Sequence, residues 1–182
     1  MLGVARYAAE DMCGAEEAFL RSVELLPTVW VLRNLAMLSM NVKGDKKAAL
    51  GYMKRAFSLS PAKENLSFLK EYAAMLTDLR RDGAWAEIYH TLPEHLRSHG
   101  RLRVFYAKDL LHMSRFEEAA EVISEDFVLN DVKEGELALS ALWKEIYTGL
   151  VEQRRGVSRA EAEEICEREY PLPYSLDFRM HD

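Results

Sequence analysis

The residues of this chain whose types and spacing could do chemistry are histidines near its middle. His95 and His99 are four residues apart, with Glu94 adjacent. Two imidazoles at this spacing share one face of a helix and could bind one metal ion, but a stable site needs three or four ligands. Arg97 and Arg101 flank the pair, and their charges repel a cation. We therefore predict solvated surface histidines, with no metal and no cofactor.

Known catalytic motifs are not found in the sequence. It contains no H-E-x-x-H, no G-x-S-x-G and no glycine-rich phosphate loop. The acidic pairs Glu16–Glu17 and Glu117–Glu118 fall early in predicted helices, where carboxylates complement the helix dipole. They are better explained by helix stability than by acid–base catalysis. We predict no catalytic residues and a protein that is not an enzyme.

Composition narrows the classes of partner. The chain has 182 residues, is 49% hydrophobic and 30% charged, and carries a net charge of −6, whereas nucleic acids and anionic membranes attract basic surfaces. Cys13 and Cys166 are far apart, so they predict ordinary thiols. The sequence shows no signal peptide and no apolar run of about 20 residues. We expect neither nucleic acid nor membrane as a partner, and the cytoplasm as the default location.

An internal repeat indicates which elements must position any site. Residues 10–27 (EDMCGAEEAFLRSVELLP) and 44–61 (GDKKAALGYMKRAFSLSP) superpose at an offset of 34 positions. Three pairs of similar residues match: Ala15 with Ala49, Phe19 with Met53, and Pro27 with Pro61. A period of this length is typical of a helical solenoid.

Each repeat is predicted to be a helix–turn–helix hairpin. Residues 28–41 are apolar over most of a helix surface, which indicates a helix packed on both sides. Gly44 breaks that helix, and a second helix is expected over residues 46–60. Pro61 is predicted to end it and to open the next helix. Ala49 is expected where the two helices cross closely, because a larger side chain would hold them apart.

The pattern resembles the tetratricopeptide repeat (TPR) family. The first two units carry its marks: Leu2–Gly3, Ala15, Phe19 and Pro27, then Leu35–Ala36, Gly44–Asp45, Ala49, Met53, Ala56 and Pro61. Tyr72–Ala73 and Tyr106–Ala107 are similar to the same pair in later units. The resemblance implies an all-α, right-handed α-solenoid of about four hairpins with C-terminal capping helices. The implied hairpins span approximately residues 1–27, 28–61, 62–93 and 94–126.

The last third of the chain departs from the repeat. Residues 127–169 are predicted to form helices that cap the solenoid, with a stop at Gly156 and a capping box from Ser158 to Glu161. Residues 170–182 are expected to be an extended tail, either folded over the final helix or acting as a docking peptide. Helical repeats with such an ending resemble the C-terminal part of large bacterial repeat proteins. Because the first hairpin starts within its first helix, we expect a fragment of a longer protein.

The resemblance also implies a concave, peptide-binding groove lined by the first helix of each hairpin. The residues expected there are Trp30, Arg33, Met37, Lys70, Arg101 and Lys108. Four cations beside a methionine suit an acidic peptide or partner protein. The competing interpretation is that they are ordinary solvated charges. For Trp30, core and ligand contact stay open, whereas Trp85 and Trp143 are expected in the core.

Two functions are compatible with these features. The first is a non-catalytic protein–protein interaction scaffold that binds a peptide or partner protein in the groove. The alternative is an accessory or oligomerisation module of a larger enzyme, with the catalytic domain N-terminal to this region. Homo-oligomerisation stays open in either case.

Overall fold

All regular secondary structure among the described residues is helical. This computed structural model describes residues 2–124, 127, 129 and 138–177. Those residues form α-helices and two short 3₁₀ helices, with no strand among them. The predicted all-α fold class is therefore confirmed. None of the described helices combines the length and the apolar character that crossing a bilayer requires.

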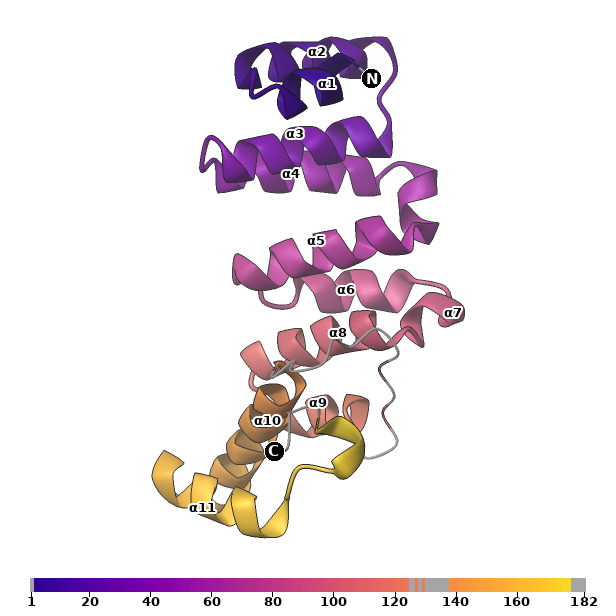
Figure 1. The fold of residues 1–182 in the computed structure, drawn as a ribbon. Coiled ribbons are helices and arrows are strands. Elements are labelled where there is room, and N and C mark those ends of the chain that lie inside the picture. Colours follow the sequence, from indigo (N-terminus) through magenta and orange to yellow (C-terminus); the bar gives the residue numbers. More distant parts are fainter. Residues whose placement is uncertain (1, 125–126, 128, 130–137, 178–182) are drawn as a thin grey trace. The chain divides into compact units, whose positions relative to one another are not determined.

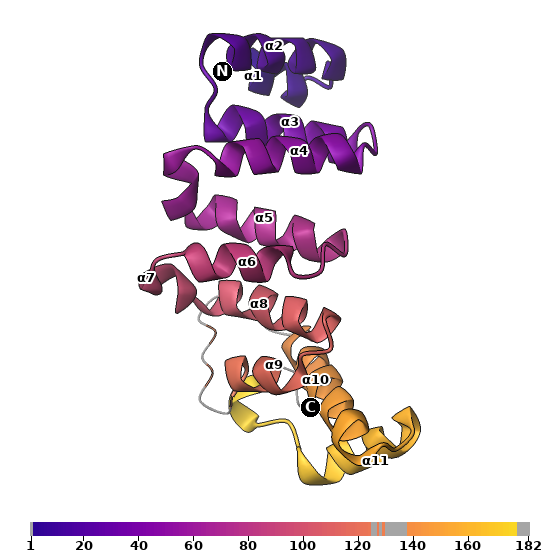
Figure 2. The ribbon, with the colours of Figure 1, turned by 180° about the vertical axis from the view of Figure 1, so that it is seen from behind.

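The chain divides into two compact units, residues 1–75 and 76–182, and the division falls within helix α5 (Leu66–Asp78). Besides the start of α5, unit 1 contains four α-helices and a 3₁₀ helix: α1 (Leu2–Ala8), α2 (Met12–Leu25), α3 (Val29–Asn41), α4 (Lys46–Phe57) and η1 (Ser60–Glu64). Figures 1 and 2 show α1 beside α2 and α3 beside α4, as two neighbouring pairs. The contacts between helices agree with this pairing: α1 packs on α2, and α3 packs on α4. The two pairs also contact each other through α2 and α3.

Local signals explain where α3 begins, where the chain turns after it and where α4 begins. Thr28 precedes α3, and its hydroxyl accepts the Val31 N–H at 3.3 Å. Gly44 has φ +66°, a conformation that favours glycine, so the chain can reverse there. The Asp45 carboxylate then accepts the Ala48 N–H at 2.9 Å at the start of α4. The predicted hairpin of residues 28–61 thus has its turn where the sequence indicates it.

The end of that hairpin differs from the prediction. Helix α4 ends at Phe57, and Pro61 lies in η1 rather than at the start of the next α-helix. Helix α5 begins at Leu66, after Asn65, whose side-chain oxygen accepts the Phe68 N–H at 3.0 Å. A capping side chain therefore starts α5. The sequence prediction overlooked this cap and assigned the start to proline.

Small residues lie at the close approach between α3 and α4. Ala36 on α3 and Ala49 on α4 are both fully buried, and these two helices pack extensively. We expect Ala49→Leu to overfill this interface and to lower the free energy of unfolding by roughly 1–3 kcal/mol. Urea denaturation measures the change. Lys47→Leu, on the exposed side of α4, is the matched control, and an equal loss in both variants would contradict close packing at Ala49.

Unit 2 is built around α8. Its described residues contain the end of α5, followed by six α-helices and a 3₁₀ helix: α6 (Ala84–Thr91), α7 (Glu94–Arg97), α8 (Gly100–His112), α9 (Phe116–Val122), α10 (Ala138–Arg155), α11 (Arg159–Glu169) and η2 (Tyr174–Leu176). Helix α8 contacts α6, α7, α9 and α10, while α10 also packs on α9 and α11. Trp85 on α6 and Trp143 on α10 are buried, as the sequence predicts.

The C-terminal helices follow their sequence signals. Gly156 has φ +64° directly after α10. The Ser158 hydroxyl accepts the Glu161 N–H at 3.4 Å, so the predicted start of a helix at Ser158 is confirmed. In the described part of the tail, the Trp143 indole donates to the Tyr170 carbonyl at 3.1 Å. Leu176 is buried, so this part of the tail packs within unit 2.

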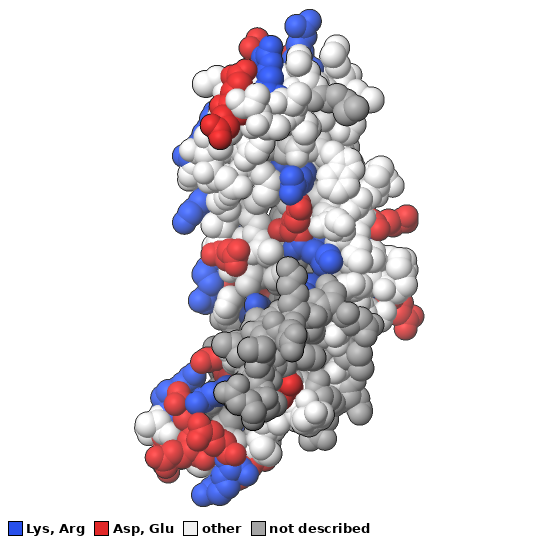
Figure 3. All heavy atoms as spheres, viewed as in Figure 1, with Lys and Arg blue, Asp and Glu red and all other residues white. Residues whose placement is uncertain are grey.

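Acidic and basic side chains are interspersed over α10 and α11 (Figure 3). Arg159 has Nη2 2.7 Å from Glu145 Oε2, Nη1 3.1 Å from Glu152 Oε2 and Nε 3.5 Å from Glu163 Oε1. Single exposed ion pairs contribute little to stability. The ion pairs of Arg159 show that the described surface of α10 and α11 mixes both signs of charge.

Candidate functional site

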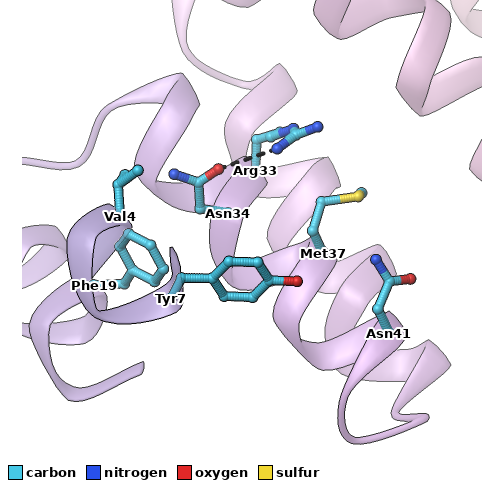
Figure 4. Close-up of a pocket in the computed structure, with 7 residues that line it drawn as sticks. All are labelled: Val4, Tyr7, Phe19, Arg33, Asn34, Met37 and Asn41. Carbon is cyan, nitrogen blue, oxygen red and sulfur yellow. Dashed lines mark hydrogen bonds between the residues drawn. The ribbon is translucent and has the colours of Figure 1, made fainter. Parts of the chain in front are cut away.

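A pocket of about 350 Å³ lies in unit 1 between α1 and α3. We call it the α1–α3 pocket, and Figure 4 shows the side chains that line it. The lining residues are Val4, Tyr7, Phe19, Arg33, Asn34, Met37 and Asn41. The pocket therefore combines apolar walls with amide, hydroxyl and guanidinium groups.

A close approach between α1 and α2 forms one wall of the pocket. Gly3 is buried in α1, and a Cβ atom added there would lie 2.6 Å from the ring of Phe19 on α2. Glycine therefore lets α1 pack directly against that ring. Val4 and Tyr7 then lie opposite α3 (Figure 4), with 54% and 37% of their surfaces exposed.

Helix α3 supplies the other wall through residues at helical spacing. Arg33, Met37 and Asn41 follow one another at intervals of four residues, so they share one side of the helix. The opposite side of α3 is held in the core by Leu32 and Leu35, both essentially buried. The core contacts of the helix thus fix which side chains face the pocket.

Arg33 is held by an ion pair with Glu71 of α5. Nε donates to Oε2 and Nη2 donates to Oε1, each at 2.6 Å, while Nη1 donates to Asn34 Oδ1 at 3.2 Å. The side chains of Arg33 and Glu71 are 29% and 35% exposed. Hydrogen bonding to Glu71 raises the pKa of Arg33 above its ordinary value. The guanidinium is therefore ionised and is paired with the carboxylate of Glu71.

The structure brings together some of the residues predicted for the groove. Arg33 and Met37 line the same pocket, while Trp30, 48% exposed, lines two other pockets of unit 1. Lys70 lies in α5 of unit 1 and is half-buried, but it does not line the α1–α3 pocket. Two further predicted residues, Arg101 and Lys108, belong to α8 of unit 2.

Lys108 and the histidines have contacts of their own. The Lys108 ammonium lies 5.9 Å from the centroid of the Phe105 ring, and His90 Nε2 lies 3.2 Å from the Tyr106 hydroxyl. His95 lies in α7, and His99 precedes α8. Within the part of the chain that the structure describes, no three His, Cys, Asp or Glu residues are grouped as metal ligands.

Several residues of this region were missed from the sequence, and Tyr7 and Glu71 show two different reasons. Tyr7 lies 34 positions before Asn41, so the repeat itself could have identified it as a lining residue. Glu71 is different. It is 38 positions from Arg33, and no spacing rule connects the two, because their meeting depends on how α3 and α5 pack.

Comparisons with known proteins find no relative from which a site could be transferred. No protein-family model matches the chain. No curated protein and no solved structure is significantly similar to it. The interpretation of the α1–α3 pocket therefore depends on its own residues.

Proposed function

We propose that this chain is a non-catalytic scaffold that binds a peptide or a segment of a partner protein. We further propose that its hairpins are TPR-like repeats of a right-handed α-solenoid, whose first helices line a concave groove. The 34-residue repeat and the packed pairs α1–α2 and α3–α4 support this arrangement. In this proposal the protein lies in the cytoplasm and binds its partner without catalysing a reaction.

The observation that carries the proposal is the lining of the α1–α3 pocket. Val4, Phe19 and Met37 offer apolar surface for an aliphatic side chain. Asn34 and Asn41 offer amide groups that can hydrogen-bond a peptide backbone. An open apolar pocket with a few polar groups is the usual form of a site for small groups or peptide side chains.

The other predicted residues extend this proposed site. Trp30 would bind a neighbouring part of the peptide, because its exposed indole gives a large contact area at low entropic cost. Lys70, Arg101 and Lys108 would contact the peptide elsewhere along the groove. They are assigned to the groove by the repeat register, so this assignment is part of the proposal.

Variants of the pocket test the proposal. A random peptide library displayed on phage is selected against the full chain, and the affinity of a selected peptide is measured by fluorescence polarisation. Replacing both Asn34 and Met37 with alanine should weaken binding by about tenfold or more, since residues central to an interface often contribute 1 kcal/mol or more each. The circular dichroism spectrum should stay helical.

The control is a double replacement outside the pocket. Lys46→Ala with Lys47→Ala changes two exposed residues at the start of α4 and should leave affinity unchanged. If the α4 variant loses the peptide and the pocket variant keeps it, the proposed site is wrong. If the library yields no peptide that binds, the peptide-binding function is wrong.

One observation favours the alternative of an accessory or oligomerisation module. Unit 1 exposes several large apolar side chains, among them Leu2 at 63%, Leu25 at 81% and Leu26 at 68%. Leu2 and Leu25 line one pocket of unit 1, and a contiguous exposed apolar patch often marks a protein–protein contact. Sedimentation velocity over a range of concentrations separates the two functions, because an oligomerisation module would show concentration-dependent association without added peptide.

A further inference from the structure

The ion pair between Arg33 and Glu71 limits what the α1–α3 pocket can bind. Among the described residues that line the pocket, only Arg33 has a charged side chain. Glu71 engages that guanidinium through two hydrogen bonds of 2.6 Å. A ligand carboxylate at Arg33 would therefore meet a cation whose charge is already offset by a carboxylate of the protein.

The pocket nevertheless keeps hydrogen-bond donors. A guanidinium has five N–H groups, and the bonds to Glu71 and Asn34 engage three of those of Arg33. Two N–H groups are left for a ligand. The amide groups of Asn34 and Asn41 and the hydroxyl of Tyr7 add further donors. The pocket thus offers several donors but little net charge.

These properties favour a neutral acceptor. An ionised carboxylate is far more costly to remove from water than an amide, and it needs an unpaired cation to compensate. An amide oxygen needs only a donor, and an adjoining aliphatic chain would contact Val4, Phe19 and Met37. We propose that Glu71 is a specificity-determining residue, which makes the α1–α3 pocket select uncharged hydrogen-bond acceptors beside an aliphatic group over carboxylates.

This inference rests on the proposed peptide-binding function and specifies its ligand. It differs from the acidic ligand predicted from the sequence, because that prediction counted Arg33 as an available charge. Glu71 does not line the pocket itself and acts through Arg33. The role of Glu71 is therefore measured by the ratio of the affinities for a neutral ligand and a carboxylate ligand, and not by the affinity for one ligand alone.

Two small probes that differ in one group test the inference. N-acetyl-leucinamide ends in a neutral amide, and N-acetyl-leucine ends in a carboxylate. Each is titrated into the full chain and followed by the backbone amide shifts of Asn34, Met37 and Asn41 in ¹⁵N-resolved NMR. The wild-type protein should bind the amide more tightly. Glu71→Gln should shift the affinity ratio toward the carboxylate by about fivefold, as expected for losing one partly exposed charge.

A control variant at an exposed glutamate shows whether the effect is specific to Glu71. Glu64→Gln removes the same charge from an exposed position of η1 and should leave the ratio unchanged. The inference is overturned if both probes bind at the pocket and Glu71→Gln does not alter their ratio. It is also overturned if neither probe shifts the pocket residues while library-selected peptides still bind. In both cases the scaffold function stands, whereas failure of all peptides and probes would remove the function as well.

Discussion

Replacing Trp85 with alanine is expected to destabilise unit 2 by about 3–5 kcal/mol, because it deletes the largest fully buried side chain among the described residues. The indole is completely buried, and its N–H donates to the Leu102 carbonyl of α8 at 3.3 Å. Alanine would leave a cavity between α6 and α8 and would remove the hydrogen bond from the indole to the Leu102 carbonyl. Urea denaturation followed by far-ultraviolet circular dichroism measures the loss.

Trp30 provides the control for this variant. Its side chain is 48% exposed, so Trp30→Ala should cost less than about 1 kcal/mol, as is usual for residues outside the core. The phenylalanine variant Trp85→Phe keeps most of the volume and should lose less than Trp85→Ala. Similar losses for Trp30→Ala and Trp85→Ala would contradict the different burial of the two tryptophans.

Replacing Asp109 with alanine is expected to lower the stability of unit 2 by about 2–4 kcal/mol. Asp109 lies in α8 and is only 2% exposed. Its carboxylate accepts the Gly83 N–H at 2.9 Å and the Ala86 N–H at 2.8 Å, at the start of α6. Alanine would leave both donors without this partner, one at the buried Ala86 and one at the half-buried Gly83, and leaving a buried donor unpaired is costly.

Two substitutions separate this effect from the mere loss of a charge. Asp78→Ala removes an exposed aspartate near the end of α5, and it should change the free energy of unfolding by less than about 0.5 kcal/mol. Asp109→Asn keeps one oxygen acceptor and should recover part of the loss. Equal unfolding midpoints for Asp109→Ala and the parent chain, measured in urea, would show that these hydrogen bonds do not stabilise α6.

Features that depend on neighbouring residues could be predicted from the sequence. The turn at Gly44 and the helix start at Ser158 are both present, since each follows from the conformation or side chain of one residue. The buried position of Ala49 followed from the 34-residue repeat. By contrast, Pro61 was assigned the wrong role, because the side-chain cap at Asn65 was overlooked.

Features that depend on distant segments could not be predicted. Arg33 and Met37 were expected on one surface and do line one pocket, because helical spacing alone places them together. The partner of Arg33 was not foreseen, since Glu71 reaches it only through the packing of α5 near α3. The same holds for Asp109, whose two N–H partners lie 23 and 26 positions earlier in the chain.

The position of Asp109 has a consequence for the order in which the chain is assembled. Helix α6 has eight residues, and it begins after Gly83, which has no side chain to cap it. A helix this short is not stable alone in water, and the carboxylate that caps it is synthesised after α6 itself. During translation, α6 should therefore emerge from the ribosome uncapped and remain unfolded until α8 follows. Its formation is then a late step, completed only when a segment made afterwards folds back onto it.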